Sequence, residues 1–224
     1  MQTITRFDRL ADRYGFIAVY PFITTYRGVR LRNCWGWWRH GDIRGGSGEV
    51  VHGGKIASCA AVAGVAYGES IWALGRYPRV KQTASTVAEM KQAMSANRDA
   101  TPLFIAHSAD GHVVGLRAAQ KLRDSWIACY DLDAESSNVT QGRHHRKPWT
   151  LTNYSDREGA STLDYLVLKG YEHGWYGGAP GPFRVPDAPD VSSMIWSFFA
   201  RHPRKGKKRT VKASATDRLR LMAS

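Results

Sequence analysis

The chain has 224 residues, a length that suits one domain, and 43% of them are hydrophobic, which is enough to form a buried core. No run of about 18 apolar residues occurs, and residues 1–15 carry charges where a secretory leader would be apolar. These features exclude a membrane-spanning helix and predict that the chain, as written, stays in the cytoplasm. Three widely spaced cysteines without a CxxC pair argue against a structural zinc site or a disulfide framework.

The formal net charge of +13 is concentrated near the carboxyl end of the chain. Residues 201–220 hold nine Lys or Arg against one acid, Asp217, and so account for +8 of the total. Such a basic segment is typically solvated, because it offers little apolar surface to bury. We therefore expect a folded domain over residues 1–203 and a basic, disordered tail over 204–224. Non-specific attraction of nucleic acid to this tail is an alternative role for the chain.

Apolar residues at helical spacing alternate along the chain with short apolar runs typical of buried strands. In chain order, we expect a helix at 5–14, a strand at 16–20, a loop at 21–48, a strand at 60–65, a helix at 86–97, a strand at 102–107, a helix at 116–130, an irregular polar segment at 131–148, strands at 149–154 and 162–168, and a helix at 190–202. This alternation predicts an α/β fold with mostly parallel strands and helices on both faces of the sheet.

Two polar loops follow the expected strands at 102–107 and 162–168. In such sheets reactive side chains lie at the carboxyl ends of the strands. The first loop contains Asp110 and the second contains His173, in the order acid then histidine that α/β-hydrolases use. Taken alone, a histidine in a glycine-rich loop is more often a structural or surface residue than a catalytic base.

Several segments, taken together, resemble successive landmarks of the poly(3-hydroxybutyrate) depolymerase family of α/β-hydrolase esterases. In chain order they are Leu10-Ala-Asp-Arg-Tyr-Gly-Phe-Ile-Ala-Val-Tyr-Pro21, Cys34-Trp-Gly-Trp-Trp38, Gly46-Ser-Gly-Glu49, Val62-Ala-Gly-Val-Ala-Tyr-Gly68, Glu172-His-Gly-Trp-Tyr-Gly-Gly178, and Pro186-Asp-Ala-Pro-Asp-Val191 with the helix Ile195-Trp-Ser-Phe-Phe199.

This resemblance implies an incomplete α/β-hydrolase sheet and hydrolysis of carboxylic esters through a serine acyl-enzyme. His173 would be the catalytic histidine and Asp110 the acid that orients it. The implied substrate is a polyester, an oligomer or a short-chain ester, and no metal or organic cofactor is implied. Members of the family are often secreted. The tryptophans Trp35, Trp37 and Trp175 are candidates to line an apolar substrate groove, although packing is the commoner use of such residues.

The sequence departs from the family pattern where the nucleophile should be. No Gly-x-Ser-x-Gly elbow occurs, and Val51 stands at the serine position of the stretch that most resembles one. The upstream oxyanion motif is also missing, although His52-Gly-Gly54 could supply backbone donors instead. Ser70 is a weak candidate nucleophile, because Trp72 replaces the second glycine of an elbow. We therefore expect impaired or absent ester hydrolysis, and a non-catalytic binding protein is the alternative.

The expected disorder of the tail can be tested by hydrogen exchange. Backbone amides after His202 should exchange with little protection, because nine basic residues repel one another and bury little surface. Mass spectrometry of the exchanged protein, digested with pepsin, measures this directly. Protection in the tail equal to that of the expected helix at 116–130 would contradict the prediction.

Overall fold

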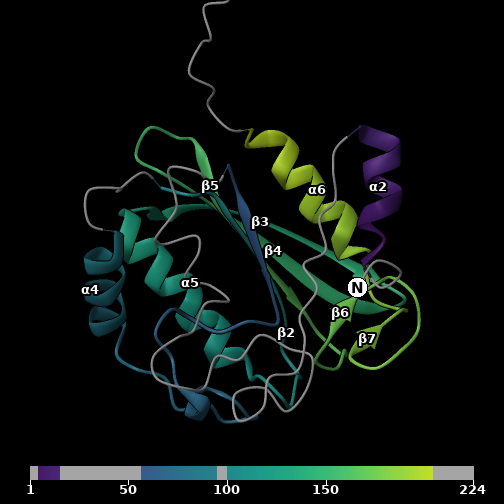
Figure 1. The fold of residues 1–224 in the computed structure, drawn as a ribbon, viewed down its shortest axis with the longest axis horizontal. Coiled ribbons are helices and arrows are strands. Elements are labelled where there is room, and N and C mark those ends of the chain that lie inside the picture. The colour runs from purple at the N-terminus through teal and green to yellow at the C-terminus, as the bar shows by residue number, and fades with distance from the viewer. Residues whose placement is uncertain (1–4, 16–56, 95–99, 204–224) are drawn as a thin grey trace, which may run out of the picture.

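The computed structural model describes residues 5–15, 57–94 and 100–203 of the chain (Figure 1). The predicted strand at 16–20, the predicted loop at 21–48 and the basic tail lie outside these residues. The described helices are α2 (Phe7–Tyr14), α4 (Thr83–Met94), α5 (Leu116–Tyr130) and α6 (Val191–Arg201), with a short 3-10 helix η2 (Ile71–Ala73). The strands are β1 (Cys59–Val62), β2 (Leu103–Ser108), β3 (Asp133–His144), β4 (Lys147–Ser155), β5 (Ser161–Leu168), β6 (Trp175–Tyr176) and β7 (Arg184–Val185).

Five of these strands form one mixed sheet in the order β1-β2-β5-β4-β3. β1, β2 and β5 run parallel to one another, whereas β4 is antiparallel to both β5 and β3. The expected α/β class is confirmed, but the expectation of mostly parallel strands is not, because β3 and β4 form a hairpin added to the parallel half. Strands β6 and β7 pair separately, in parallel, after β5.

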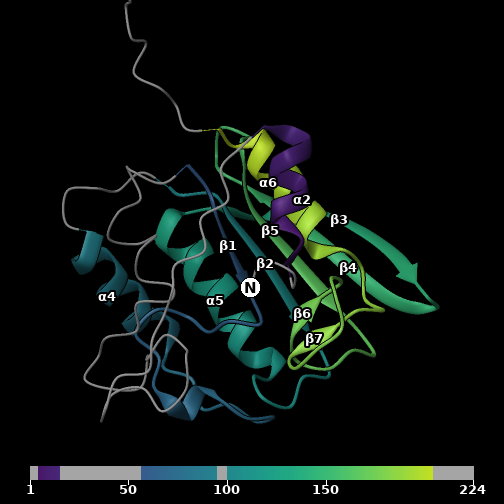
Figure 2. The ribbon, with the colours of Figure 1, turned by 45° about the vertical axis from the view of Figure 1, so that its right-hand side comes forward.

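Helices cover both faces of the sheet, as the alternation of the sequence predicts (Figures 1 and 2). On one face, side chains of α4 and α5 such as Met90 and Trp126 pack against Leu103 and Ile105 of β2. On the other face, Ile195 and Phe198 of α6 pack against Phe104 and Ala106 of the same strand. Every residue of β2 is buried. Successive side chains of a strand point to opposite faces, so β2 supplies both cores at once.

The amino-terminal helix α2 packs beside α6 at the carboxyl-terminal end of the described chain (Figures 1 and 2). The rings of Tyr14 and Trp196 stack with their centroids 5.3 Å apart. Gly15 ends α2 in the left-handed conformation at φ 71°, which glycine adopts without the cost that a Cβ brings. The predicted helix at 5–14 is thereby confirmed.

A buried carboxylate joins the end of α6 to the sheet. Asp164 of β5 is 1% exposed and accepts hydrogen bonds from Asn153 Nδ2 and Arg201 Nη2, each at 2.7 Å. A buried carboxylate without partners would be costly. Because both of its oxygens are bonded, the charge is compensated and α6 is held in register over β5.

The segment expected to be irregular, residues 131–148, is mostly the long edge strand β3. Its side chains are largely exposed, so it lacks the apolar alternation from which a strand is recognised in sequence. The pairing with β4 gives it regular structure, through a register that runs from Asp133 opposite Ser155 to His144 opposite Lys147. β3 is therefore a strand because of its hydrogen bonds to β4, and not because of the pattern of its own sequence.

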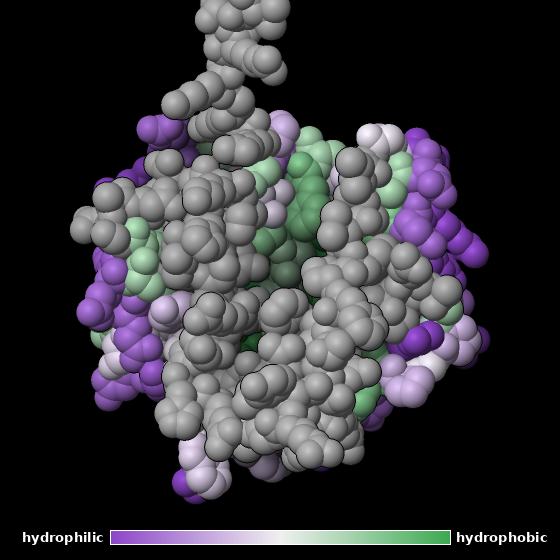
Figure 3. Space-filling view, in the orientation of Figure 1, coloured by the Kyte–Doolittle hydropathy of each residue, from purple (hydrophilic) through white to green (hydrophobic). Residues whose placement is uncertain are grey.

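No helix within the described residues is long and apolar enough to cross a membrane. Figure 3 shows hydrophobic residues along the middle of the face seen in Figure 1, with hydrophilic residues on both sides.

We expect truncation of a buried side chain in the central strand β5 to be strongly destabilising. Leu166 of β5 is completely buried in the core under α6. Leu166→Ala should therefore lower the free energy of unfolding by about 2–5 kcal/mol, because apolar burial is lost and a cavity is left behind. Urea denaturation measures the change. The matched control is Val139→Ala on the edge strand, where the side chain is 51% exposed and the expected change is within about 0.5 kcal/mol. Equal effects at the two positions would contradict the described packing.

Candidate functional site

The loops that follow β2 and β5 meet at one edge of the sheet. Ala109 N donates to Leu168 O at 2.7 Å, and the hydroxyl of Ser108 donates to Tyr171 O. Gly170 N donates to Asp110 Oδ2 at 2.6 Å. These bonds fix the Asp110 loop against the loop that leads to His173, because each joins a residue after β2 to a residue at or after the end of β5. Carboxyl ends of parallel strands are where α/β sheets place their reactive groups.

His173 lies half-buried in this edge with its Nδ1 atom buried and without a hydrogen-bond partner. A Cβ built at Gly111 would lie 3.6 Å from the Cβ of His173, so the two loops approach each other closely there. The Phe183 ring stands nearly perpendicular to the imidazole, with the centroids 6.2 Å apart. Burial lowers the pKa of His173, which favours the neutral imidazole that a general base requires.

Glycine is needed beside His173 for the turn that positions the imidazole. A Cβ at Gly174 would lie 2.7 Å from the carbonyl oxygen of Phe183, closer than any side chain tolerates. The next residue, Trp175, donates its backbone N–H to the same oxygen at 2.9 Å. The paired strands β6 and β7 therefore fix the backbone immediately after His173.

Asp110 and His173 come to the same edge, but no hydrogen bond or ion pair joins their side chains in this structure. The Asp110 carboxylate is exposed and accepts from Gly170 N, and its backbone N–H donates to Ser108 Oγ at 3.1 Å. The prediction that this aspartate orients the imidazole stays a prediction.

A second histidine, His107, is buried at the end of β2 near His173. It is 1% exposed, and its Nε2 atom lies 2.9 Å from Val114 O, so Nε2 carries the proton that this carbonyl accepts. The Nδ1 atom is buried and unpaired. The pKa of His107 is lowered to about 4, chiefly by burial and in smaller part by the charge of nearby His173. Both imidazoles at this edge are therefore neutral at pH 7.

The candidate nucleophiles are engaged elsewhere. Ser70 is exposed and directly precedes η2, and its Oγ accepts a hydrogen bond from Trp72 N at 3.4 Å. Ser108 is closer in the chain to the site, but it is 1% exposed and its hydroxyl donates to Tyr171 O. Within the described residues, neither hydroxyl is hydrogen bonded to His173.

One constellation at this edge was not singled out in the sequence. His112 Nδ1 lies 3.2 Å from Glu172 Oε2, and His112 Nε2 lies 3.2 Å from Arg76 Nη1. The arginine can only donate, so Nε2 accepts and the proton on Nδ1 faces the carboxylate. Glu172 directly precedes His173, and His112 follows Asp110 by two residues, so the sequence places both in the two candidate loops. Arg76 is distant in the chain, and only the fold brings it to His112.

The predicted substrate-lining tryptophans have different outcomes. Trp35 and Trp37 lie outside the described residues, as do Val51 and the glycine pair after His52. Trp175 is half-buried and donates from Nε1 to Ser192 Oγ at 3.2 Å, while its ring packs edge-on to Phe7 with centroids 6.2 Å apart. In the described part of the chain its indole thus joins α2 and α6. No group of three or more His, Cys, Asp or Glu side chains in residues 5–15, 57–94 and 100–203 could hold a metal ion.

Comparison of the chain with models of known protein families gave no match, and comparison with curated protein sequences gave no significant match.

The buried neutral His107 predicts a pH dependence of stability. Its folded pKa of about 4 lies below the unfolded value of about 6.5. The contribution of the neutral His107 imidazole to the free energy of unfolding is therefore complete above about pH 6.5. It is lost as the pH falls toward 4, because the unfolded state binds a proton that the folded state does not. When the pH is lowered from 7 to 4.5, the free energy of unfolding should fall in both proteins. The fall should be smaller in His107→Gln than in the wild type, by roughly 2 kcal/mol.

Urea denaturation at the two pH values checks this prediction. Glutamine keeps a donor for Val114 O but does not titrate, so protonation is the difference being measured. The control is His145→Gln in the hairpin turn, where the side chain is exposed and the pH dependence should match the wild type. An unchanged pH dependence in the His107 variant would contradict the buried neutral imidazole.

Proposed function

We propose that this chain is a carboxylic-ester hydrolase by descent, with His173 as its general base and Asp110 as the acid of the same site, and that its turnover is severely impaired. The observation that carries the proposal is the meeting of the Asp110 and His173 loops at the carboxyl ends of the adjacent parallel strands β2 and β5. The chain order of acid before histidine is also that of α/β-hydrolases. The resemblance of the surrounding segments to poly(3-hydroxybutyrate) depolymerase-type esterases supplies the substrate class.

The environment of His173 supports the role of a base. Burial keeps the imidazole neutral near pH 7, which is the state that a base requires. The Nδ1 atom, which pairs with the acid in a Ser-His-Asp triad, is buried and has no hydrogen-bond partner. An acyl-transfer site also needs a hydroxyl or thiol within about 3 Å of the ring and donors for the oxyanion. Neither Ser70 nor Ser108 is hydrogen bonded to His173, since the Ser70 Oγ accepts from Trp72 N and the Ser108 hydroxyl donates to Tyr171 O.

Impairment follows from what the site lacks. Loss of one oxyanion donor lowers turnover by about 10²–10³, and loss of the nucleophile of a triad lowers it by still more. A neutral histidine alone can still act as a weak base toward water at an activated ester. The chemistry that remains is slow hydrolysis, with His173 accepting the proton of the attacking water.

We expect purified wild-type protein to hydrolyse p-nitrophenyl butyrate no more than about tenfold faster than buffer, for lack of an activated nucleophile. A fluorophosphonate probe should label no serine, and any excess hydrolysis should disappear in His173→Ala. Absorbance of the released nitrophenolate and mass spectrometry of the probe-treated protein measure these outcomes. The matched control is His145→Ala, which removes an exposed histidine of the hairpin turn.

Two results would overturn the proposal in different ways. Stoichiometric labelling of Ser70 or of another serine, abolished by His173→Ala, would show a complete and active hydrolase site. Excess ester hydrolysis that is equal in the wild type, His173→Ala and His145→Ala would show that His173 is not the base.

A further inference from the structure

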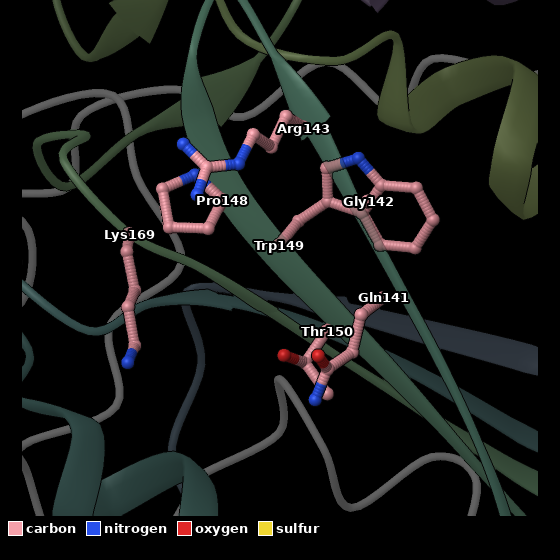
Figure 4. A pocket seen from close by; sticks show the side chains of 7 residues that line it. All are labelled: Gln141, Gly142, Arg143, Pro148, Trp149, Thr150 and Lys169. Atoms are coloured by element: carbon pink, nitrogen blue, oxygen red, sulfur yellow. The ribbon is translucent and has the colours of Figure 1, made fainter.

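The hairpin of β3 and β4 forms a pocket of about 370 Å³, and neither Asp110 nor His173 is among the residues that line it (Figure 4). It lies toward the turn of the hairpin, and the residue that follows β5 by one position completes it. The lining residues are Gln141, Gly142, Arg143, Pro148, Trp149, Thr150 and Lys169.

The ladder between the two strands positions the polar lining groups. Gln141 pairs with Thr150 and Arg143 pairs with Pro148, and residues directly opposite in a ladder point to the same face. Thr150 also pairs with Val167 of β5, which packs in the core on the α5 side. The pocket therefore opens on the α5 face of the sheet, where the hairpin extends beyond the helices (Figure 2).

Two backbone features hold this geometry. Lys169 N donates to Pro148 O at 3.0 Å, which fixes Lys169 beside β4. A Cβ at Gly142 would lie 2.3 Å from Cζ2 of Trp149, so the indole packs directly over the glycine backbone. Only glycine permits this approach, and β3 and β4 are thereby fixed at the pocket in a single register. A site on paired strands presents its ligand groups at fixed spacing.

The charge of the pocket is entirely positive. Arg143 and Lys169 contribute two cations, Gln141 and Thr150 add an amide and a hydroxyl donor, and no acidic residue is among the lining residues. Within the described part of the chain the Lys169 ammonium forms no ion pair, and Arg143 makes one long bond, from Nη1 to Arg146 O at 3.4 Å. Other basic side chains of the chain, such as Arg157 with Asp131 and Arg201 with Asp164, are neutralised by carboxylates.

We propose that this pocket is a binding site for a phosphate group. A guanidinium and an ammonium that line the same pocket, together with neutral amide and hydroxyl donors, suit the charge and the several acceptor oxygens of phosphate better than the single charge of a carboxylate. The phosphate belongs either to a small phosphorylated molecule or to the backbone of a nucleic-acid strand. Because the side chains are exposed, binding weakens as salt rises. This site is independent of the proposed ester chemistry at His173.

The test is isothermal titration calorimetry of the full chain with two probes, inorganic pyrophosphate and a 12-nucleotide oligothymidylate. The variant R143Q/K169Q removes both cations and keeps side chains of similar length. The matched control R157Q/K91Q removes two exposed charges elsewhere, one at the other end of β4 and one on α4. All four side chains lie at the surface, and circular dichroism confirms that each variant is folded.

We expect wild type and control to bind pyrophosphate alike, and R143Q/K169Q to bind it at least about tenfold more weakly, since both cations that line the pocket are removed. If only the oligothymidylate shows that difference, the phosphate comes from a nucleic-acid strand. If both probes bind equally to R143Q/K169Q and R157Q/K91Q, the attraction is bulk charge and the proposal is wrong. If the wild type binds neither probe, the proposal is also wrong.

Discussion

The burial of β2 and β5 on both faces is the constraint on which the rest of this molecule depends. Every side chain of β2 is buried, and β5 is buried almost throughout. Phe104 and Leu166 pack under α6, whereas Ile105 and Leu163 pack under α4 and α5. Because a strand alternates its side chains between two faces, neither strand can shift by one residue without exposing both cores. The parallel pair is therefore fixed, and its two carboxyl ends must emerge together.

The candidate site forms where the carboxyl ends of β2 and β5 meet, and the same packing restricts which side chains can face one another there. The loops after the two strands share hydrogen bonds through Ser108 and Asp110, and they pack His173 beside buried His107. Burial keeps both imidazoles neutral, which is useful for a base. The same packing turns the Asp110 carboxylate toward Gly170 N and the Ser108 hydroxyl toward Tyr171 O. Asp110 and His173 thus come to one edge of the sheet, and within the described residues neither Ser70 nor Ser108 is hydrogen bonded to His173.

The antiparallel hairpin added beyond β5 follows different physical rules. β3 is largely exposed and β4 is mostly half-buried, and the regularity of the hairpin comes from backbone pairing and from the indole of Trp149 over Gly142. Polar and basic side chains can therefore line one face at no cost to the core. One short segment after β5 contacts both the hairpin and the candidate site. Lys169 lines the pocket, and the Tyr171 hydroxyl donates to His144 O in the hairpin at 3.1 Å. Between them, Gly170 N donates to the Asp110 carboxylate. The pocket and the candidate site are thus neighbours along a single connection.

The sequence by itself determined the elements whose burial is periodic or continuous. Helix α5 and strands β2 and β5 lie where apolar spacing predicts them, and the chain order placed Asp110 and His173 after adjacent strands. Only the tertiary structure decided the existence of the edge strand β3 and the antiparallel direction of β4, because β3 has no apolar face and exists through its hydrogen bonds to β4. Likewise, only the fold brings Arg76 to His112 and Lys169 to Arg143. Local pattern records which side chains are hidden from water, whereas contacts between exposed polar groups depend on how distant segments are packed, and no local pattern encodes them.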